Sequence, residues 1–193
     1  MVEANSVAVP HLLNPVKLQG SLLNLRAALA TDSERLFDSY FQSIEAARFL
    51  RRAPHSSVSQ TRAVLQKWCE WGTRVNKSNF GWVISDAKSD CPVGVLYVMH
   101  DGVAAEVHYG IGVPFWNQGY ATEAVTLASN WLLAQDAVQS VWTAVDWENT
   151  QTRRVLEKAG FAQDGVLANW AIFPAFSEKT ARDALRYQRL RIE

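Results

Sequence analysis

The sequence predicts one domain of the α/β or α+β class, built around a mixed sheet. Its 193 residues suit a single domain, long enough to bury about 70% of its unfolded surface. Apolar residues recur at helical spacing in the first third of the chain and alternate as in strands from Phe80 onward. Beyond residue 104 strands and helices alternate, with no repeat, low-complexity segment or interior linker.

The first third predicts an irregular arm, one strand and three helical segments. Residues 1–15 contain two prolines and no periodicity, so we expect an arm followed by a domain over residues 16–193. The expected elements are a strand over 18–26 and helices over 33–41, 43–50 and 59–71. Asp32 can cap the first helix, and Gly72 follows the third as a stop.

The middle of the chain predicts strands joined by tight turns. The expected strand ranges are 80–85, 93–99 and 104–113. Asp101 and Gly102 form a strong hairpin signal, because both residue types tolerate turn conformations. In the third strand the odd-numbered side chains 107–113 share an apolar face, and the even-numbered side chains 106–112 share the other.

The last part predicts helices alternating with strands. We expect helices over 120–133 and 149–159, and strands over 140–146, within 161–173, and over 184–191. Asn149 can cap the second helix and Gly160 can end it. Four tryptophans on apolar periodic faces are expected in the core, namely Trp68, Trp71, Trp131 and Trp142, while Trp147 is expected beside a cleft.

Composition excludes several functional classes. The chain carries 19 Lys and Arg and 19 Asp and Glu, so its formal net charge is zero and no basic field favours nucleic acid or membrane as a partner. The pairs Arg51-Arg52 and Arg153-Arg154 are expected on solvated helix surfaces. The first residues lack a signal-peptide pattern, and no apolar run approaches the ~18 residues of a membrane span, so we expect a cytoplasmic protein.

The two cysteines, Cys69 and Cys91, are expected to be reduced packing thiols. Their spacing does not indicate a metal site, and a disulfide between them stays open from sequence alone. No histidine or basic cluster stands near either one in the sequence, so neither is a convincing nucleophile.

The segment 112–124 predicts an anion site. A strand runs into a tight loop that opens directly into a helix, and Gly119 and Ala121 are too small to cover the main chain. The N–H groups of residues 117–122 can therefore converge on one anion at the positive end of the helix, as in a pyrophosphate cradle. The alternative is an ordinary strand–loop–helix connection with small residues for packing.

Three blocks, taken together and in this order, resemble the GNAT superfamily of acyl-CoA-dependent N-acetyltransferases. They are the strand over 105–111, the loop and helix start over 116–124, and the segment 149–161 that begins at Asn149 and ends in Gly160-Phe161. The branch they most resemble is the ribosomal-protein alanine N-acetyltransferases. The strong match covers about residues 93–161.

The resemblance implies a largely antiparallel mixed sheet that is splayed, with acetyl-CoA as cosubstrate and no metal. The strands over 104–113 and 140–146 would part and admit the pantetheine arm, while the helix after the first of them takes the pyrophosphate. The residues implied or expected to bind the cosubstrate are Ile111, Val113, Asn117, Gln118, Gly119, Tyr120, Ala121, Thr122 and Asn149.

The sequence departs from the family pattern at several positions. Asn117 and Gln118 stand where Lys or Arg often assists the phosphates, so affinity would depend more on main-chain amides. Leu156 occupies the place of the tyrosine that protonates the departing thiolate in many members. Thr152 replaces a serine common in the resembled branch and keeps the hydroxyl, and His108 stands where that branch usually has glycine.

Acetyl transfer to an amine needs a proton acceptor, an oxyanion donor and a route out for the thiolate. Glu106, a carboxylate on a strand that otherwise reads as core, is our first candidate to remove the amine proton, directly or through water. His108 lies on the same face and is either a partner in proton transfer or structural, and these two residues are too few for a metal site. The N–H near Ile111 is the expected oxyanion donor, and Thr152 is either a thiol partner or a helix-surface residue.

These features predict an N-acetyltransferase that acts by direct attack in a ternary complex. The acceptor would be a primary amine, on a protein N-terminus or on a small molecule, and the oligomeric state, monomer or homodimer, stays open. The alternative is a non-catalytic acyl-CoA-binding or sensing protein, which the leucine at position 156 favours. A dinucleotide-binding oxidoreductase is excluded because the glycine spacing does not match its fingerprint.

Overall fold

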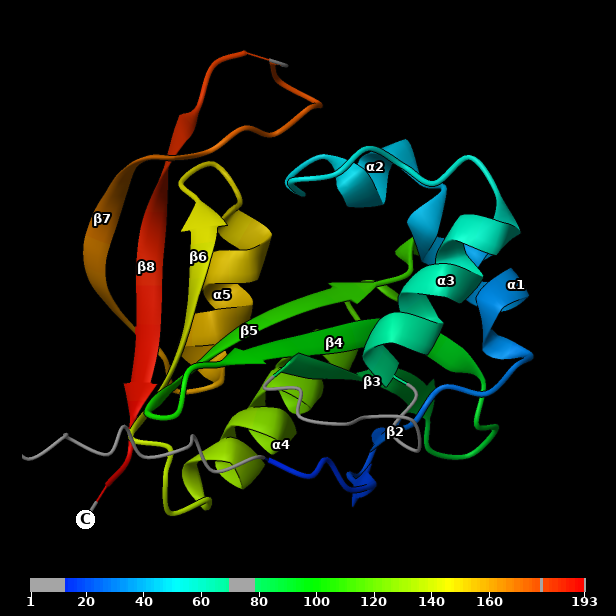
Figure 1. Ribbon diagram of the computed structural model, residues 1–193, viewed down its shortest axis with the longest axis horizontal. Helices are drawn as coiled ribbons and strands as arrows, with labels where there is room; N and C mark the ends of the chain where they lie inside the picture. The colour runs from blue at the N-terminus through cyan, green and yellow to red at the C-terminus, as the bar shows by residue number, and fades with distance from the viewer. Residues whose placement is uncertain (1–12, 70–78, 178, 193) are drawn as a thin grey trace, which may run out of the picture.

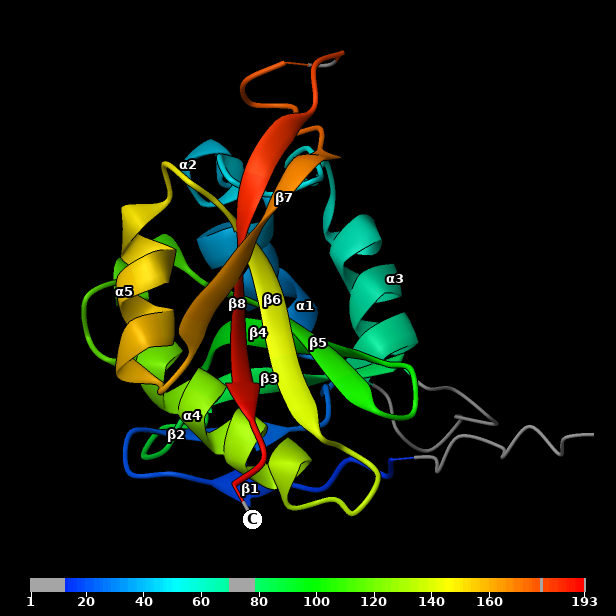
Figure 2. The same ribbon diagram turned by 90° about the vertical axis from the view of Figure 1, so that its left-hand side faces the viewer.

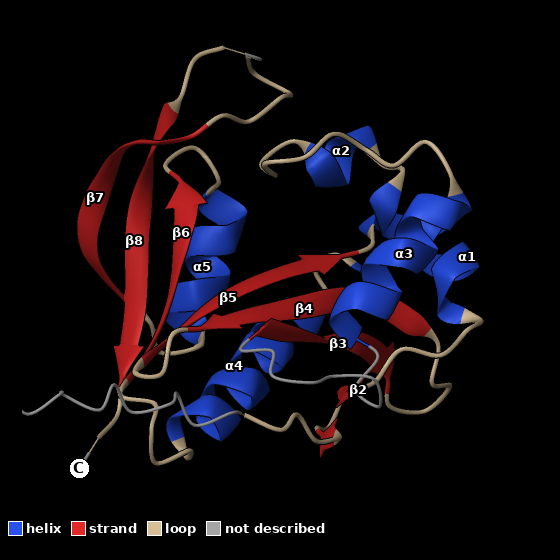
Figure 3. Cartoon of the chain, viewed as in Figure 1, coloured by secondary structure: helices blue, strands red, loops and turns tan. Residues whose placement is uncertain are grey.

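An eight-stranded sheet with helices on both faces forms the centre of the molecule (Figure 1). The computed structural model describes residues 13–69, 79–177 and 179–192. Most of the expected N-terminal arm therefore lies outside the described residues. The strand order is β1-β2-β3-β4-β5-β6-β8-β7, and Figure 3 shows how helices and strands divide the chain. No helix within the described ranges is long and apolar enough to cross a membrane.

The element boundaries follow the sequence expectations closely. The strands are β1 Leu18–Gln19, β2 Leu23–Arg26, β3 Asn79–Asp86, β4 Pro92–His100, β5 Ala104–Ile111, β6 Ser140–Asp146, β7 Ala162–Ala171 and β8 Arg182–Leu190. The helices are α1 Asp32–Leu36, the π-helix η1 Phe37–Phe41, α2 Ile44–Ala47, α3 Val58–Cys69, the 3-10 helix η2 Val113–Phe115, α4 Tyr120–Leu133 and α5 Thr150–Lys158.

The sheet splays between β5 and β6. These strands are parallel neighbours only where Ala104–Glu106 pair with Ser140–Trp142, while every other neighbouring pair in the sheet is antiparallel. Beyond Glu106 the two strands diverge, as Figure 1 shows. The predicted splayed mixed sheet is confirmed.

Two apolar layers sandwich the sheet. On one face α4 and α5 cover a large core that includes Leu96, Val107 and Val125. On the other face η1 and α3 cover a smaller core around Phe41 and Leu65. Figure 2 shows α3 on one side of the sheet and α4 and α5 on the other. The cleft between β5 and β6 thus opens between two helical layers.

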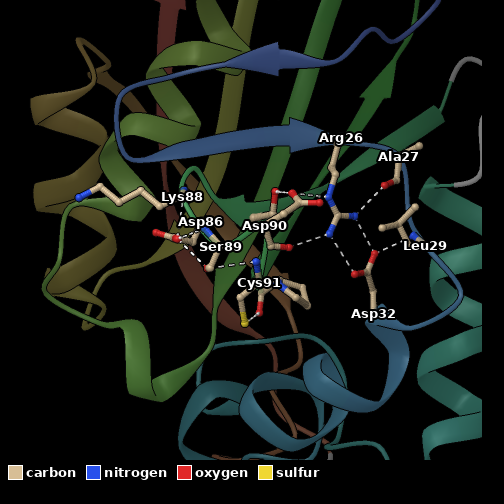
Figure 4. A network of polar contacts seen from close by, with 11 residues as sticks. Arg26, Ala27, Leu29, Asp32, Asp86, Lys88, Ser89, Asp90 and Cys91 are labelled. Atoms are coloured by element: carbon tan, nitrogen blue, oxygen red, sulfur yellow. Dashed lines mark hydrogen bonds and ion pairs between the residues drawn. The ribbon is translucent and has the colours of Figure 1, made fainter.

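Near the N-terminus the structure corrects two expectations. The strand expected over 18–26 is interrupted, because the Glu123 carboxylate accepts hydrogen bonds from the main-chain N–H groups of Ser21 and Leu22 and holds a turn there. Asp32 does not cap α1, whose N-cap is Thr31. The Asp32 carboxylate is instead buried against the Arg26 guanidinium, with two short contacts of 2.8 and 3.0 Å (Figure 4).

The helix expected over 33–41 changes to π geometry after Leu36. Gln42 N–H donates to the carbonyl of Phe37, five residues earlier, at 3.1 Å. This turn lies directly on β5, since a Cβ on Gly110 would come within 2.0 Å of the Tyr40 hydroxyl. The strand expected over 104–113 ends at Ile111, because Val113–Phe115 turns into a 3-10 helix.

Not all of the tryptophans predicted to lie in the core are found there. Trp131 and Trp68 are only partly buried but pack against the core as expected, and Trp71 lies outside the described residues. Trp142 is only partly buried. It is the last residue of β6 that pairs with β5, and its ring packs edge-on against that of Trp170, with 6.1 Å between the ring centres. Trp147 is 53% exposed.

Candidate active site

A cavity of about 670 Å³ lies where β5 and β6 have parted. Its walls come from η1 and α2 on one side, from α5 on the other, and from β5 with the start of α4 between them. Of the residues predicted to serve the site, the lining includes Ile111, Asn117, Gly119, Tyr120, Ala121, Thr122, Asn149 and Thr152. Val113, Gln118, Glu106 and His108 lie outside this lining.

The loop before α4 presents a row of main-chain donors. Asn117 and Gly119 have φ angles of 60° and 90°, a left-handed conformation that suits glycine and asparagine. The first N–H of α4 that bonds back to the loop is that of Glu123, which donates to Gly119 O at 3.1 Å. For residues 117–122, no acceptor among the described parts of the chain takes up the main-chain N–H groups, and Gly119 has no side-chain cap. The helix end is therefore open to an anion.

Side chains around this loop are turned away from the row of donors. The Trp116 indole N–H donates to Ile111 O at 2.7 Å, and the Gln118 amide donates to Pro114 O at 3.0 Å. The Tyr120 hydroxyl donates to Asp86 at 2.7 Å, which raises the pKa of Tyr120 to about 12. The pKa of Asp86 falls to about 2, first through the Ser89 hydroxyl and then through Tyr120. The loop is thus held in place by contacts that leave its amides free.

The edge of β5 faces the cavity with main-chain groups. Gly112 N–H donates to Val93 O on β4 at 2.8 Å, so by strand alternation the N–H of Ile111 points to the other side, where β6 has moved away. The Ile111 carbonyl accepts the hydrogen bond from the Trp116 indole N–H. An N–H donor is left at the point expected for the oxyanion.

Helix α5 supplies groups that the sequence interpretation missed. Asn149 caps the helix by accepting from Thr152 N–H at 3.1 Å, as predicted. Arg154 and Lys158, one turn apart, line the cavity and form no ion pair with a described residue. Arg154 is exposed on α5, as expected for a solvated helix surface, and it also borders the cavity. The spacing of four residues places Arg154 and Lys158 on one face of α5, but only the packing of α5 decides that this face borders the cavity.

Arg52 departs from its expected place on a solvated helix surface, because one of its guanidinium nitrogens is buried. Its guanidinium lies 4.8 Å from the ring centre of Phe41 and 5.2 Å from that of Tyr40. Tyr40 lines the cavity above Gly110. No local pattern marked Tyr40, because only the π-helical turn and the space left by Gly110 on β5 bring it there.

Glu106 and His108 form a pair at the apex of the splay. Glu106 is the last β5 residue that pairs with β6, and its side chain is 13% exposed. His108 Nε2 lies 2.9 Å from Glu106 Oε1, without the direction of a full hydrogen bond, and its side chain is 37% exposed. No third His, Cys, Asp or Glu completes a metal-binding group with them among the described residues. The pair lies on the face of β5 opposite Val107 and the core under α4.

Comparison with known proteins identifies the family. A family model described as an acetyltransferase (GNAT) domain matches residues 23–162. The chain belongs to the GNAT acetyltransferase family. An uncharacterized N-acetyltransferase of Bacillus licheniformis is 22% identical to this GNAT protein over 149 residues, 77% of this chain and 83% of the relative.

Solved GNAT structures share the fold at low identity. RimL, a ribosomal-protein alpha-N-acetyltransferase in complex with coenzyme A, superposes with a TM-score of 0.74 at 17% identity, over 89% of this chain and 95% of its own. Spermidine N-acetyltransferase from Vibrio cholerae, in complex with CoA and spermine, superposes with a TM-score of 0.71 at 17% identity, over 89% of this chain and 97% of its own. The expected fold and superfamily are confirmed. The protein is an N-acetyltransferase that passes an acetyl group from acetyl-CoA to an amine.

Proposed function

We propose that this GNAT protein acetylates the primary amine of a peptide N-terminus or of a small molecule, by direct attack in a ternary complex. The observation that carries the proposal is the row of unpaired amides over residues 117–122, which opens into a cavity at the splay of β5 and β6. In this proposal the amides hold the diphosphate, and Arg154 and Lys158 neutralise its charge from α5.

The remaining cofactor contacts would come from β5 and α5. The Asn149 side-chain oxygen is used to cap α5, which leaves its amide hydrogens for a pantetheine carbonyl. The Ile111 N–H would stabilise the oxyanion as the tetrahedral intermediate forms, because it is already fixed in the strand and does not need to reorganise. Val113 and Gln118 would act only through the shape of the loop, since their side chains do not face the cavity.

Glu106 and His108 would remove the amine proton. Glu106 is mostly buried, while the ring of His108 is the more exposed member of the pair, so His108 faces the approaching acceptor and Glu106 stands behind it. The amine then attacks the thioester carbonyl directly. Neither cysteine lines the cavity, which is consistent with transfer that uses no protein nucleophile.

The acceptor would enter from the side of η1 and α2. This wall carries Glu45, Arg48 and Phe49, so it presents both charge signs beside an aromatic ring. The structurally similar enzymes include one named for a ribosomal protein and one bound to spermine. The mixed wall and the resemblance to the ribosomal-protein branch favour a peptide N-terminus over a polyamine.

The proposal is tested by incubating the protein with acetyl-CoA and a panel of peptides and small amines while free thiol is measured. We expect thiol release with at least one acceptor and a Glu106→Gln variant about 10²–10⁴-fold slower at neutral pH, with acetyl-CoA affinity unchanged. Glu34→Gln, an exposed change on α1, is the matched control and should leave the rate as it is. Tight coenzyme A binding without thiol release across the panel would instead favour the non-catalytic binder.

A further inference from the structure

Tyr109 carries a buried hydroxyl that the proposed chemistry does not yet use. Its ring lines the cavity, but its oxygen is closed off from solvent and makes no aligned hydrogen bond with any described residue. Buried phenol groups usually find a partner, because an unpaired polar atom costs stability. We therefore expect that this hydroxyl, in the wall of the cavity, forms its hydrogen bond only when the cosubstrate is bound.

Thr152 is the polar side chain that interacts with this phenol. It comes from the first turn of α5, lines the same cavity and acts on the Tyr109 hydroxyl, although the two are not aligned as a full hydrogen bond. A helix threonine commonly donates its hydroxyl to a carbonyl of the preceding turn. The Thr152 hydroxyl makes no such bond in the described part of the chain, although the main-chain N–H of the same residue donates to the Asn149 side chain.

We propose that Tyr109 is a positioning residue that directs the Thr152 hydroxyl at the departing coenzyme A sulfur. The phenol donates its hydrogen to the Thr152 oxygen. Since a hydroxyl has one hydrogen, Thr152 then has its own hydrogen free to point into the cavity. This inference rests on the proposed function. Hydrogen bonds that are loose in the unliganded enzyme commonly tighten in the reacting complex.

The acceptor nitrogen bonds to the carbonyl carbon and gives one proton to the Glu106–His108 pair, and the carbon–sulfur bond breaks with its electron pair on sulfur. The thiolate is held by the Thr152 O–H and takes its proton from water as it leaves. Burial raises the pKa of Tyr109 well above that of a thiol, about 8.5. Tyr109 therefore keeps its proton and acts as a hydrogen-bond donor only.

Position 156 explains why such a pair is needed. Many members of the GNAT superfamily protonate the thiolate with a tyrosine at this place. Leu156 offers no hydroxyl and is fully buried in the core between α5 and the sheet. The donor to sulfur must come from another residue, and Thr152, one turn earlier on α5 and with Tyr109 behind it, supplies one from the cavity wall.

The test measures the pKa of the coenzyme A thiol in its complex with the protein, from thiolate absorbance over a pH series. This needs no knowledge of the acceptor. Tyr109→Phe removes only the hydroxyl, and we expect it to raise the pKa of the bound thiol by about 1 to 2 and to slow acetyl transfer about 10- to 100-fold. Coenzyme A affinity at low pH, where the thiol is neutral, should change less than about twofold.

Double variants show whether Tyr109 acts through Thr152. In a Thr152→Val background, Tyr109→Phe should have no further effect, whereas in Thr152→Ser it should keep its full effect. Tyr187→Phe is the matched control. It removes another buried phenol hydroxyl, bonded to Arg153 and Glu157 outside the cavity, and should leave the bound-thiol pKa unchanged.

Three results would overturn the inference. They are a bound-thiol pKa that Tyr109→Phe leaves unchanged, an equal rise in the Tyr187→Phe control, or independent effects of the two changes in the double variant. Failure of the unaltered protein to bind coenzyme A is a different outcome, because it overturns the proposed function and this inference together.

Discussion

Replacing Gly119 by valine tests the amide row at the start of α4. Gly119 has φ 90° and ψ −11°, and it is followed by the first residue of α4. A residue with a side chain pays about 1–2 kcal/mol to adopt this left-handed conformation, and a β-branched one at least as much. The added Cβ would lie 3.2 Å from the end of the Leu22 side chain, which can move aside. Backbone strain therefore dominates the effect.

The strain is relieved if φ at residue 119 becomes negative. That change turns the peptide group between residues 119 and 120 and takes at least one N–H out of the row. A hydrogen bond to a charged group is worth about 1.5–3 kcal/mol, so the loss of one corresponds to about 10- to 100-fold weaker binding of coenzyme A. Gly119→Ala, which is less crowded, should show a smaller loss in the same direction.

Calorimetric titration with coenzyme A measures the affinity, and chemical denaturation measures the free energy of unfolding. Gly165→Val is the matched control, because a Cβ there meets nothing within 4 Å and the residue lies in β7, away from the cavity. We expect the control to bind coenzyme A as the unaltered protein does. Unchanged affinity in the folded Gly119→Val protein, or an equal loss in the control, would show that the amide row does not hold the diphosphate.

Further predictions concern stability. Asp32→Ala removes the partner of the buried Arg26 guanidinium and should lower the free energy of unfolding by about 3–5 kcal/mol in urea denaturation. Asp136→Ala, which breaks an exposed contact of 3.6 Å to Arg191, should cost less than about 1 kcal/mol, and equal losses would contradict this account. Burial lowers the pKa of His100, so the unfolded chain takes up a proton more readily, and stability should fall as pH drops below about 6.5. His100→Leu should flatten that decline below about pH 6.5 in urea titrations, and an unaltered slope would assign it to other groups such as His55.

Local signals in the sequence predicted most elements and their limits. Helix α4 and strand β6 run over the ranges expected from apolar spacing, and α5 is capped by Asn149 and followed by Gly160 at φ 84°. These features depend on a few neighbouring residues, so a single chain carries the information. The same holds for the small residues and the left-handed glycine of the loop at Gly119, whereas the contact from Tyr120 to Asp86 that helps to hold the loop depends on the fold.

Longer-range features were not accessible in this way. Residues 18–26 look like one strand until Glu123, about 100 positions later, binds the turn at Ser21. Trp142 has the periodicity of a core residue, but β5 leaves β6 beside it and no layer covers it fully. Tyr109 was assigned correctly to the apolar face of its strand, and only the docking of α5 shows that its hydroxyl meets Thr152 there.

The sequence by itself determined the type of fold, the order of the elements and the loop of small residues before α4, because periodicity, caps and small residues act over one or two turns. The tertiary structure decided where β5 and β6 separate, which cations of α5 border the cavity, and that Tyr40 and Tyr109 line it. Those outcomes depend on the angles at which distant elements pack, and no segment of the chain encodes such an angle alone.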